Sequence, residues 1–198
     1  MRFATACLTV VVTVALLAFA SRLSAAEAPE WTVDPDASRV GFVAQQSGDP
    51  VPGAFESFDA SIHFAPDQLE TSRVNVEIRI GSVDAGSGER NQTITSPSLF
   101  HAAKYPTARF HATRLRQVGD GQYVATGDLT MRGNTHTVEL PFDLDITRRD
   151  GTLRAVADGA ITVERLRWGI GKGQWKATSM VPNEVRIEIK IVATRPAE

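Results

Sequence analysis

The sequence contains almost no cysteine. The one cysteine among 198 residues, Cys7, lies within the first 26 residues, a segment whose pattern predicts removal. The remaining chain would then hold no disulfide, no thiolate metal site and no cysteine nucleophile. An oxidising compartment accounts for this lack, because a lone thiol is a liability there.

An excess of positive charge is missing too. Residues 27–198 lack Arg2 and Arg22, so they keep 19 of the 21 basic side chains against 23 acidic ones, a net charge of −4. Without a basic block to neutralise phosphates, nucleic acid is excluded as an expected partner. No apolar run after residue 26 is long enough to cross a bilayer as a helix. Residues 27–198 are therefore expected to form one exported domain.

The first 26 residues have the pattern of a cleavable signal peptide. Arg2 gives a positive start, residues 4–20 are almost continuously apolar, and Ser24 and Ala26 fit the small residues of a cleavage site. We expect cleavage after Ala26, which defines residues 1–26 as the signal peptide and predicts an exported product. The alternative is an uncleaved membrane anchor, since the apolar run is nearly long enough to span.

What the sequence does contain is period-two alternation of apolar and polar residues. In residues 184–191, four aliphatic side chains alternate with four charged ones, a pattern typical of an antiparallel strand with one dry face. Eight segments of this kind are predicted: 39–45, 55–64, 73–80, 108–118, 122–131, 137–147, 153–166 and 184–191. The clearest turn signals between them are Gly119-Asp120-Gly121, Gly133-Asn134 and Asp150-Gly151.

The arrangement of these segments predicts an all-β fold. Eight strands with mostly local connections favour an eight-stranded antiparallel barrel over a two-sheet sandwich. Residues 84–105 interrupt the pattern, and Ser96–Phe100 is expected to form a short helical insertion with Pro97 at its first position. Such a barrel either fills its interior with side chains or holds one slender ligand.

Residues that could carry chemistry are few. None of the four histidines stands at a metal-ligand spacing from another; they are His63, His101, His111 and His136. No serine, histidine and aspartate arrangement can be placed either. No metal, cofactor or catalytic residue is therefore expected. The glycine-rich stretch 168–175 lacks the ending of a phosphate loop. It is either a strand end with Trp168 in the core, or a rim at which Trp168 or Trp175 lines an entrance.

Several fragments together resemble the YceI-like polyisoprenoid-binding proteins, from about Trp31 to Ala193. They are Trp31-Thr32-Val33-Asp34, Ser38-Arg39-Val40-Gly41-Phe42, Phe58-Asp59-Ala60, Ile62-His63-Phe64, Ser82-Val83-Asp84, Lys104-Tyr105-Pro106-Thr107 and Gly127 to Gly133. Residues 168–171 and 181–185 resemble a branch often encoded beside b-type cytochromes. The resemblance implies an extended lipocalin-like barrel that is exported to the periplasm and holds an isoprenoid chain.

One segment departs from the family pattern. Where many members carry Arg-Asp-x-His-Leu-Arg-Ser, residues 90–96 read Arg-Asn-Gln-Thr-Ile-Thr-Ser. The missing Asp, His and Arg argue against carrying over a pyrophosphate site. Together with the cytochrome-associated branch, they favour a quinone over a polyprenyl phosphate as the ligand.

The expected function is non-enzymatic binding, transport or storage of an isoprenoid lipid inside the barrel. The residues expected to line the lipid tunnel are Phe42, Val76, Ile78, Phe110, Tyr123, Leu129, Phe142, Leu144, Ile161, Trp168, Ile187 and Ile189. Any of them could instead fill a packed core. The alternatives are a lipid-free interaction module for a membrane redox partner such as a b-type cytochrome, and an enzyme acting on a bound lipid. A homodimer formed through an exposed strand edge is a further hypothesis.

Overall fold

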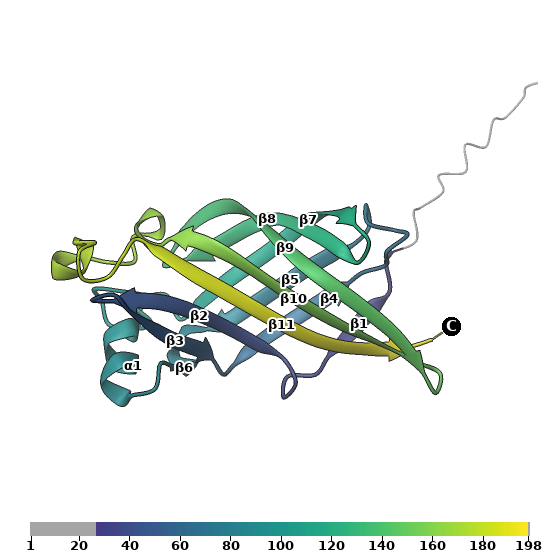
Figure 1. The fold of residues 1–198 in the computed structure, drawn as a ribbon, viewed down its shortest axis with the longest axis horizontal. Helices are drawn as coiled ribbons and strands as arrows, with labels where there is room; N and C mark the ends of the chain where they lie inside the picture. Colours follow the sequence, from purple (N-terminus) through teal and green to yellow (C-terminus); the bar gives the residue numbers. More distant parts are fainter. Residues whose placement is uncertain (1–26, 198) are drawn as a thin grey trace, which may run out of the picture.

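The computed structural model describes residues 27–197, so the predicted signal peptide lies outside the described residues. The strands are β1 (Glu30–Val33), β2 (Arg39–Gln46), β3 (Asp49–Phe55), β4 (Phe58–His63), β5 (Arg73–Arg79), β6 (Val83–Asp84), β7 (Thr107–Gly119), β8 (Gln122–Met131), β9 (Asn134–Arg149), β10 (Thr152–Glu164) and β11 (Glu184–Pro196) (Figure 1). The helical elements of this region are α1 (Gly88–Thr95) and the 3-10 segments η1 (Ile80–Ser82), η2 (Arg165–Trp168) and η3 (Gly173–Lys176). None of these helices is long and apolar enough to cross a membrane.

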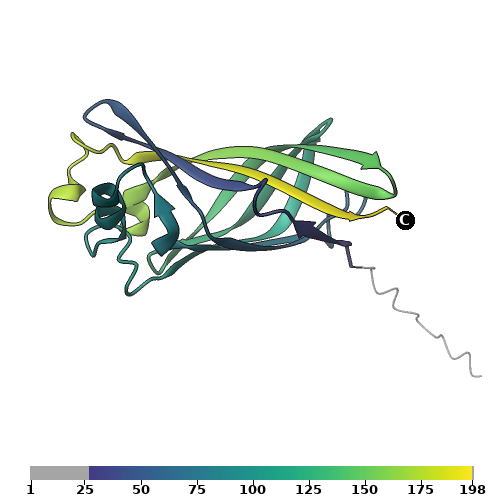
Figure 2. The ribbon, with the colours of Figure 1, turned by 90° about the horizontal axis from the view of Figure 1, so that it is seen from below.

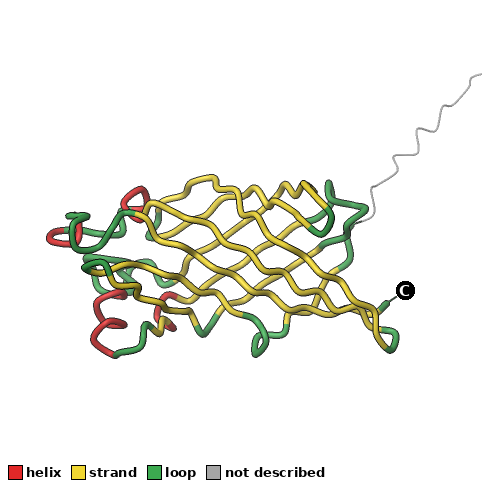
Figure 3. Tube along the Cα trace, in the orientation of Figure 1, coloured by secondary structure: helices red, strands yellow, loops and turns green. Residues whose placement is uncertain are grey.

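Eight of the strands close into an antiparallel barrel. The sheet runs in the order β1-β4-β5-β7-β8-β9-β10-β11, and a further pairing of β1 with β11 completes the ring. The pairings in this ring are antiparallel, and the strands cross the barrel at a slant (Figure 3). The predicted eight-stranded antiparallel barrel is therefore confirmed.

Three additional strands extend the sheet at one end of the barrel. Strand β11 pairs with β1 through Ala193 and Thr194, but with β2 through residues 186–190. Because β1 and β2 pair with the same edge of β11, β2 continues the wall beyond β1. Strand β3 then pairs with β2, and β6 pairs with β3. These strands, α1 and the β10–β11 connection lie together at one end, and both termini of the described chain lie at the other (Figures 1 and 2).

The hairpin turns can be compared with the positions predicted from glycine, asparagine and aspartate, and one of them is displaced. Asp150 and Gly151 have φ of 49° and 74°, as the tight turn of a twisted hairpin requires. In the β8–β9 hairpin, Arg132 and Gly133 have φ of 49° and 75°. The turn predicted at Gly133-Asn134 is thus wrong by one residue, and Asn134 is instead the first residue of β9.

The helical insertion also differs from the prediction. Helix α1 begins after Ser87, whose hydroxyl accepts a hydrogen bond from Arg90 N at 3.3 Å, and it ends at Thr95, before Ser96. Pro97 therefore follows the helix and does not begin it. The physical reason is that a proline disfavours helical geometry in the residue before it, so Ser96 adopts extended backbone with ψ of 161°.

Two apolar clusters occupy the two ends of the barrel interior. The first, at the end that holds the termini, contains Trp31, Phe64, Leu115 and Tyr123; Trp31 Nε1 donates to Phe64 O at 2.8 Å. The second contains Ile80, Ala108, Leu129, Met131, Val163, Trp168 and Ile170. We call these the terminal cluster and the α1-side cluster.

Candidate functional site

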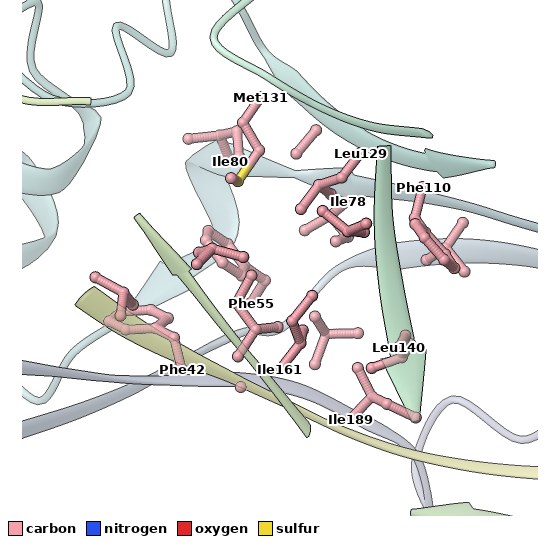
Figure 4. Close-up of a pocket in the computed structure, with 18 of the residues that line it drawn as sticks. Phe42, Phe55, Ile78, Ile80, Phe110, Leu129, Met131, Leu140, Ile161 and Ile189 are labelled. Atoms are coloured by element: carbon pink, nitrogen blue, oxygen red, sulfur yellow. The ribbon is translucent and has the colours of Figure 1, made fainter. Parts of the chain in front are cut away.

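A cavity of about 760 Å³ runs through the barrel interior. Its walls come from the inward positions of the strands, such as Ile78 on β5, Leu129 on β8, Ile161 on β10 and Ile189 on β11, which Figure 4 shows pointing into one shared space. Along β11, the inward aliphatic residues are half-buried while the residues between them are exposed. Residual exposure on the inner face of a closed barrel is what an unfilled interior produces.

The cavity opens at the α1 end. Five of its lining residues are exposed, and all five lie on β2 or at the start of α1: Gln45, Gln46, Ser87, Glu89 and Arg90. At the opposite end, the lining includes Trp31, Phe64, Leu115 and Ala193, all of them buried. The cavity is thus a tunnel with a mouth and a closed end.

Polarity changes along the tunnel in the same direction. The polar side chains in the lining are the five exposed ones together with Thr93 and Arg165, and these belong to β2, the α1 region and η2. Further in, the lining consists of aliphatic and aromatic side chains, and the Trp31 N–H is already bonded to Phe64 O. The inner part offers hydrocarbon contacts, whereas the mouth offers hydrogen bonds.

Three aromatic rings stand in a row beside the mouth. Phe42 and Phe55 have centroids 5.7 Å apart, and Phe55 meets Phe100 edge-on at 6.1 Å. Gly53, opposite Phe42 in the β2–β3 pair, makes room for the first ring, because a Cβ there would overlap Phe42 Cζ. The row joins β2, β3 and the segment after α1 into one apolar wall.

A long connection, residues 169–183, borders the mouth through Ile170, Trp175 and Val181, and we call it the rim loop. Arg165 anchors it: Nη1 donates to Ile170 O at 2.8 Å, Nη2 to Val181 O at 2.7 Å and Nε to Pro182 O at 3.0 Å. Arg165 is buried, and desolvation lowers its pKa. Its donors hold both arms of the loop, so they are committed to backbone carbonyls.

Comparison with known proteins places the chain in a family. The YceI-like domain matches residues 31–193, which is most of the chain. The chain belongs to the YceI-like family. A UPF0312 protein of Vibrio cholerae is 31% identical over 140 residues, covering 70% of this chain and 73% of that protein. One from Photorhabdus laumondii is 39% identical over 92 residues, but the match spans only 47% of that protein.

Solved structures of other proteins share the fold. BcnA of Burkholderia cenocepacia is 32% identical, with a TM-score of 0.75, and the match covers 81% of this chain and 99% of that one. A domain from Saccharophagus degradans, described as polyisoprenoid-binding and implicated in plant cell wall breakdown, has a TM-score of 0.65 over 84% of this chain and 98% of that one. At 14% identity, this second match shows the fold alone.

Ten of the twelve residues predicted to line a tunnel in this YceI-like barrel do line the cavity. They are Phe42, Val76, Ile78, Phe110, Leu129, Phe142, Leu144, Ile161, Ile187 and Ile189. Residues from seven strands are thus brought together around one space. Whether they contact a lipid remains a proposal.

The other two predicted residues lie behind the lining. Tyr123 packs in the terminal cluster, stacked on Phe142 with centroids 5.6 Å apart. Trp168 is 1% exposed, and its Nε1 donates to Leu129 O at 2.9 Å. For Trp168 the structure agrees with the core interpretation of the glycine-rich stretch, while Trp175 is the tryptophan that lines the mouth.

Several lining residues were absent from the predicted set. Phe55 stands at the first position of the predicted strand 55–64, and Pro50 and Pro52 obscure the alternation of β3 before it. Phe100 lies outside any strand or helix, so periodicity gives no signal for it. Leu140 alternates with Phe142 along β9 and lines the same cavity.

Proposed function

We propose that this YceI-like protein binds an isoprenoid lipid in its tunnel and carries or stores it in the periplasm. The observation that carries the proposal is an apolar cavity of about 760 Å³ with a polar mouth at the α1 end. Small-molecule sites typically enclose about 300–1,000 Å³. Each five-carbon isoprene unit buried there contributes about 4 kcal/mol before ordering costs are subtracted. A few units therefore suffice to hold a water-insoluble chain.

The distribution of polar groups supports a defined orientation of the ligand. A hydrocarbon tail fits the inner tunnel, where the lining offers no polar side chain, and the head group fits at the mouth beside Gln45, Gln46 and Thr93. The polyisoprenoid named for the Saccharophagus domain is a ligand of this shape. The direction of insertion is tail first, towards the terminal cluster.

The charges at the mouth favour a neutral head group over a pyrophosphate. Arg90 and Glu89 both line the mouth, so one positive and one negative charge stand side by side. Arg165 is the other cation in the lining, and its donors are bonded to carbonyls of the rim loop. Phosphate sites usually gather several cationic donors. A quinone, which needs only hydrogen bonds to its carbonyl oxygens, suits this mouth better.

The lining also supports binding without catalysis. Its titratable side chains are Glu89, Arg90 and Arg165, and it contains no histidine, aspartate or cysteine within the described residues. None of the three is placed beside an acid–base partner deep in the tunnel, where a bound chain would lie. A carrier needs no such group.

A titration of delipidated, exported protein tests this proposal. A prenylated quinone and a polyprenyl phosphate of equal chain length are compared by isothermal titration calorimetry. We expect saturable binding of the quinone that is at least about tenfold tighter than binding of the phosphate. Arg90→Gln should weaken the phosphate and leave the quinone nearly unchanged. Tighter binding of the phosphate contradicts the quinone preference, and no saturable binding of either removes the carrier function.

The alternative is an interaction module that binds a membrane redox partner, such as a b-type cytochrome, and holds no lipid. The open cavity favours the carrier over this alternative, because a module of that kind requires only its outer surface. The cytochrome partner and the homodimer both stay predictions. An empty tunnel in protein purified from the periplasm would favour the module.

A further inference from the structure

The connection between β10 and β11, beside the mouth, concentrates positive charge in an otherwise acidic chain. Residues 165–183 contain four basic side chains and no aspartate or glutamate, whereas the whole sequence has 21 basic and 23 acidic residues. Arg165 is buried, but Arg167, Lys172 and Lys176 are exposed. The segments around the mouth, 45–50 and 86–105, add two acidic and two basic residues. The exposed Glu164, Glu184 and Asp84 flank these segments and reduce the excess, so the positive charge is concentrated in the β10–β11 connection itself.

The rim loop also presents apolar groups to solvent beside these cations. Met180 is 56% exposed, and together with Val118 it makes up the large hydrophobic residues found exposed in the described chain. Trp175 is half-buried and lines the mouth. Lysines beside tryptophan and an exposed apolar side chain are the combination found where proteins rest on a membrane interface.

The fold fixes the rim loop in this presentation. Arg165 bonds carbonyls on both of its arms, Lys172 N donates to Ser98 O at 2.8 Å, and Ser47 N donates to Met180 O at 2.8 Å. The loop is therefore tied to the segment after α1 and to the β2–β3 hairpin, which form the other sides of the mouth. The segment that carries Lys172 and Lys176 is therefore held against the elements that line the opening.

We propose that the rim loop docks the mouth onto the surface of an anionic lipid bilayer. Lys172, Lys176 and Arg167 meet the negative head groups, while Met180 and Trp175 enter the interfacial layer. An anionic bilayer is the partner we infer because its charge complements that of the loop, and because Trp175 belongs both to the loop and to the lining of the tunnel. If the proposed lipid-carrier function holds, docking gives the chain a path between bilayer and tunnel that avoids water. The docking itself does not depend on that function.

Vesicle co-sedimentation of the exported protein tests this docking. Vesicles of phosphatidylcholine alone are compared with vesicles that also contain phosphatidylglycerol, at low and at high salt. We expect binding to the anionic vesicles that weakens as salt screens the charges. The Lys172→Glu/Lys176→Glu variant should bind at least about tenfold more weakly. Lys190→Glu is the matched control, because Lys190 is exposed on the barrel wall, in the β11 segment that pairs with β2; it should bind as the unaltered protein does.

The outcomes separate docking from lipid carriage. Equal binding to both kinds of vesicle, or equal losses in the double variant and in Lys190→Glu, overturns the docking. Neither Lys172 nor Lys176 lines the cavity, so the double variant should keep its tunnel lipid, measured by mass spectrometry of an organic extract. Anionic-vesicle binding by protein whose extract is empty would uphold docking while removing the carrier function.

Discussion

The two ends of the barrel are made from the same alternating strands, but one end is closed and the other is open. At the terminal end, Trp31, Phe64 and Tyr123 fill the interior, and β1 closes the ring between β4 and β11. At the α1 end, β11 has exchanged β1 for β2, and short elements surround an opening. A period-two pattern specifies which side chains face inward, but the size of those side chains decides whether the interior is filled.

A pair of arginines shows the same contrast. At the terminal end, the guanidinium of Arg195 lies 5.2 Å from the centre of the Trp31 ring and covers the buried aromatic cluster. At the mouth, Arg165 bonds three carbonyls and holds a loop that has little core of its own. The terminal end is closed by packing, whereas the rim loop at the other end is held by a few directed hydrogen bonds. The two ends should therefore respond differently to substitution.

The largest effect is expected from Trp31→Ala. Removing a buried tryptophan from the terminal cluster should lower the free energy of unfolding by about 3 to 5 kcal/mol. Trp175→Ala, at the half-buried rim, is the matched control and should cost less than about 1 kcal/mol. Urea unfolding followed by circular dichroism measures both. Similar costs for the two tryptophans would break the distinction between a packed end and an open one.

A smaller stability loss is expected from Arg165→Met, together with a local change. The substitution leaves the carbonyls of Ile170, Val181 and Pro182 without their donor, which should cost about 2 to 3 kcal/mol. Hydrogen exchange should accelerate across the rim loop and stay unchanged in the terminal cluster. Arg167→Met, at an exposed neighbour, is the control. Uniform acceleration over the whole barrel would show that Arg165 does not act locally.

Blocking the tunnel should change lipid content more than stability. Ile161 faces the cavity on β10, and Ile161→Trp should fill the space between mouth and closed end at a cost of about 1 to 3 kcal/mol. Thr162→Trp places the same side chain on the exposed face of the same strand. Lipid recovered per mole of folded protein should fall in the first variant alone. Equal recovery from both would place the ligand elsewhere.

The smallest effect expected is on alkaline stability at the terminal end. Burial, and secondarily the Asp120 carboxylate, raises the pKa of Tyr123 above its ordinary value. Above about pH 10 the unfolded chain releases this proton before the folded protein does, so stability should fall as pH rises. Tyr123→Phe removes that component. Its unfolding free energy, measured between about pH 9 and pH 11, should decline less steeply than that of the unaltered protein. If the unfolding free energies of the two proteins fell equally steeply with pH, Tyr123 would not be the group responsible.

Much of the barrel follows from the sequence because its strands are long and strongly alternating. Residues 184–191 were sufficient to predict β11, although the strand runs on to Pro196. The predicted strand 55–64 was less successful: it merges the end of β3 with β4, because Glu56 and Ser57 interrupt the pairing without a glycine or proline to mark the break. Local composition could not show that interruption.

The cavity itself could not be predicted. Tyr123 and Leu129 both face inward on β8, yet the first is packed behind Phe142 and the second lines the tunnel. That difference depends on how side-chain volumes from several strands add up, which no single segment reveals. The rim loop was recognisable as unusual from its glycines and Trp175, but its anchor on Arg165 depends on contacts formed only in the folded chain.

Mass spectrometry of an organic extract tests the central claim most directly. The protein is purified from a bacterial periplasm without detergent, and its extract is compared with that of Ile161→Trp. The tail-inward carrier predicts a near-stoichiometric prenylated species from the unaltered protein, with a quinone head group, and little from the variant. An extract with no prenylated lipid from the unaltered protein, or an equal yield from both, would contradict it.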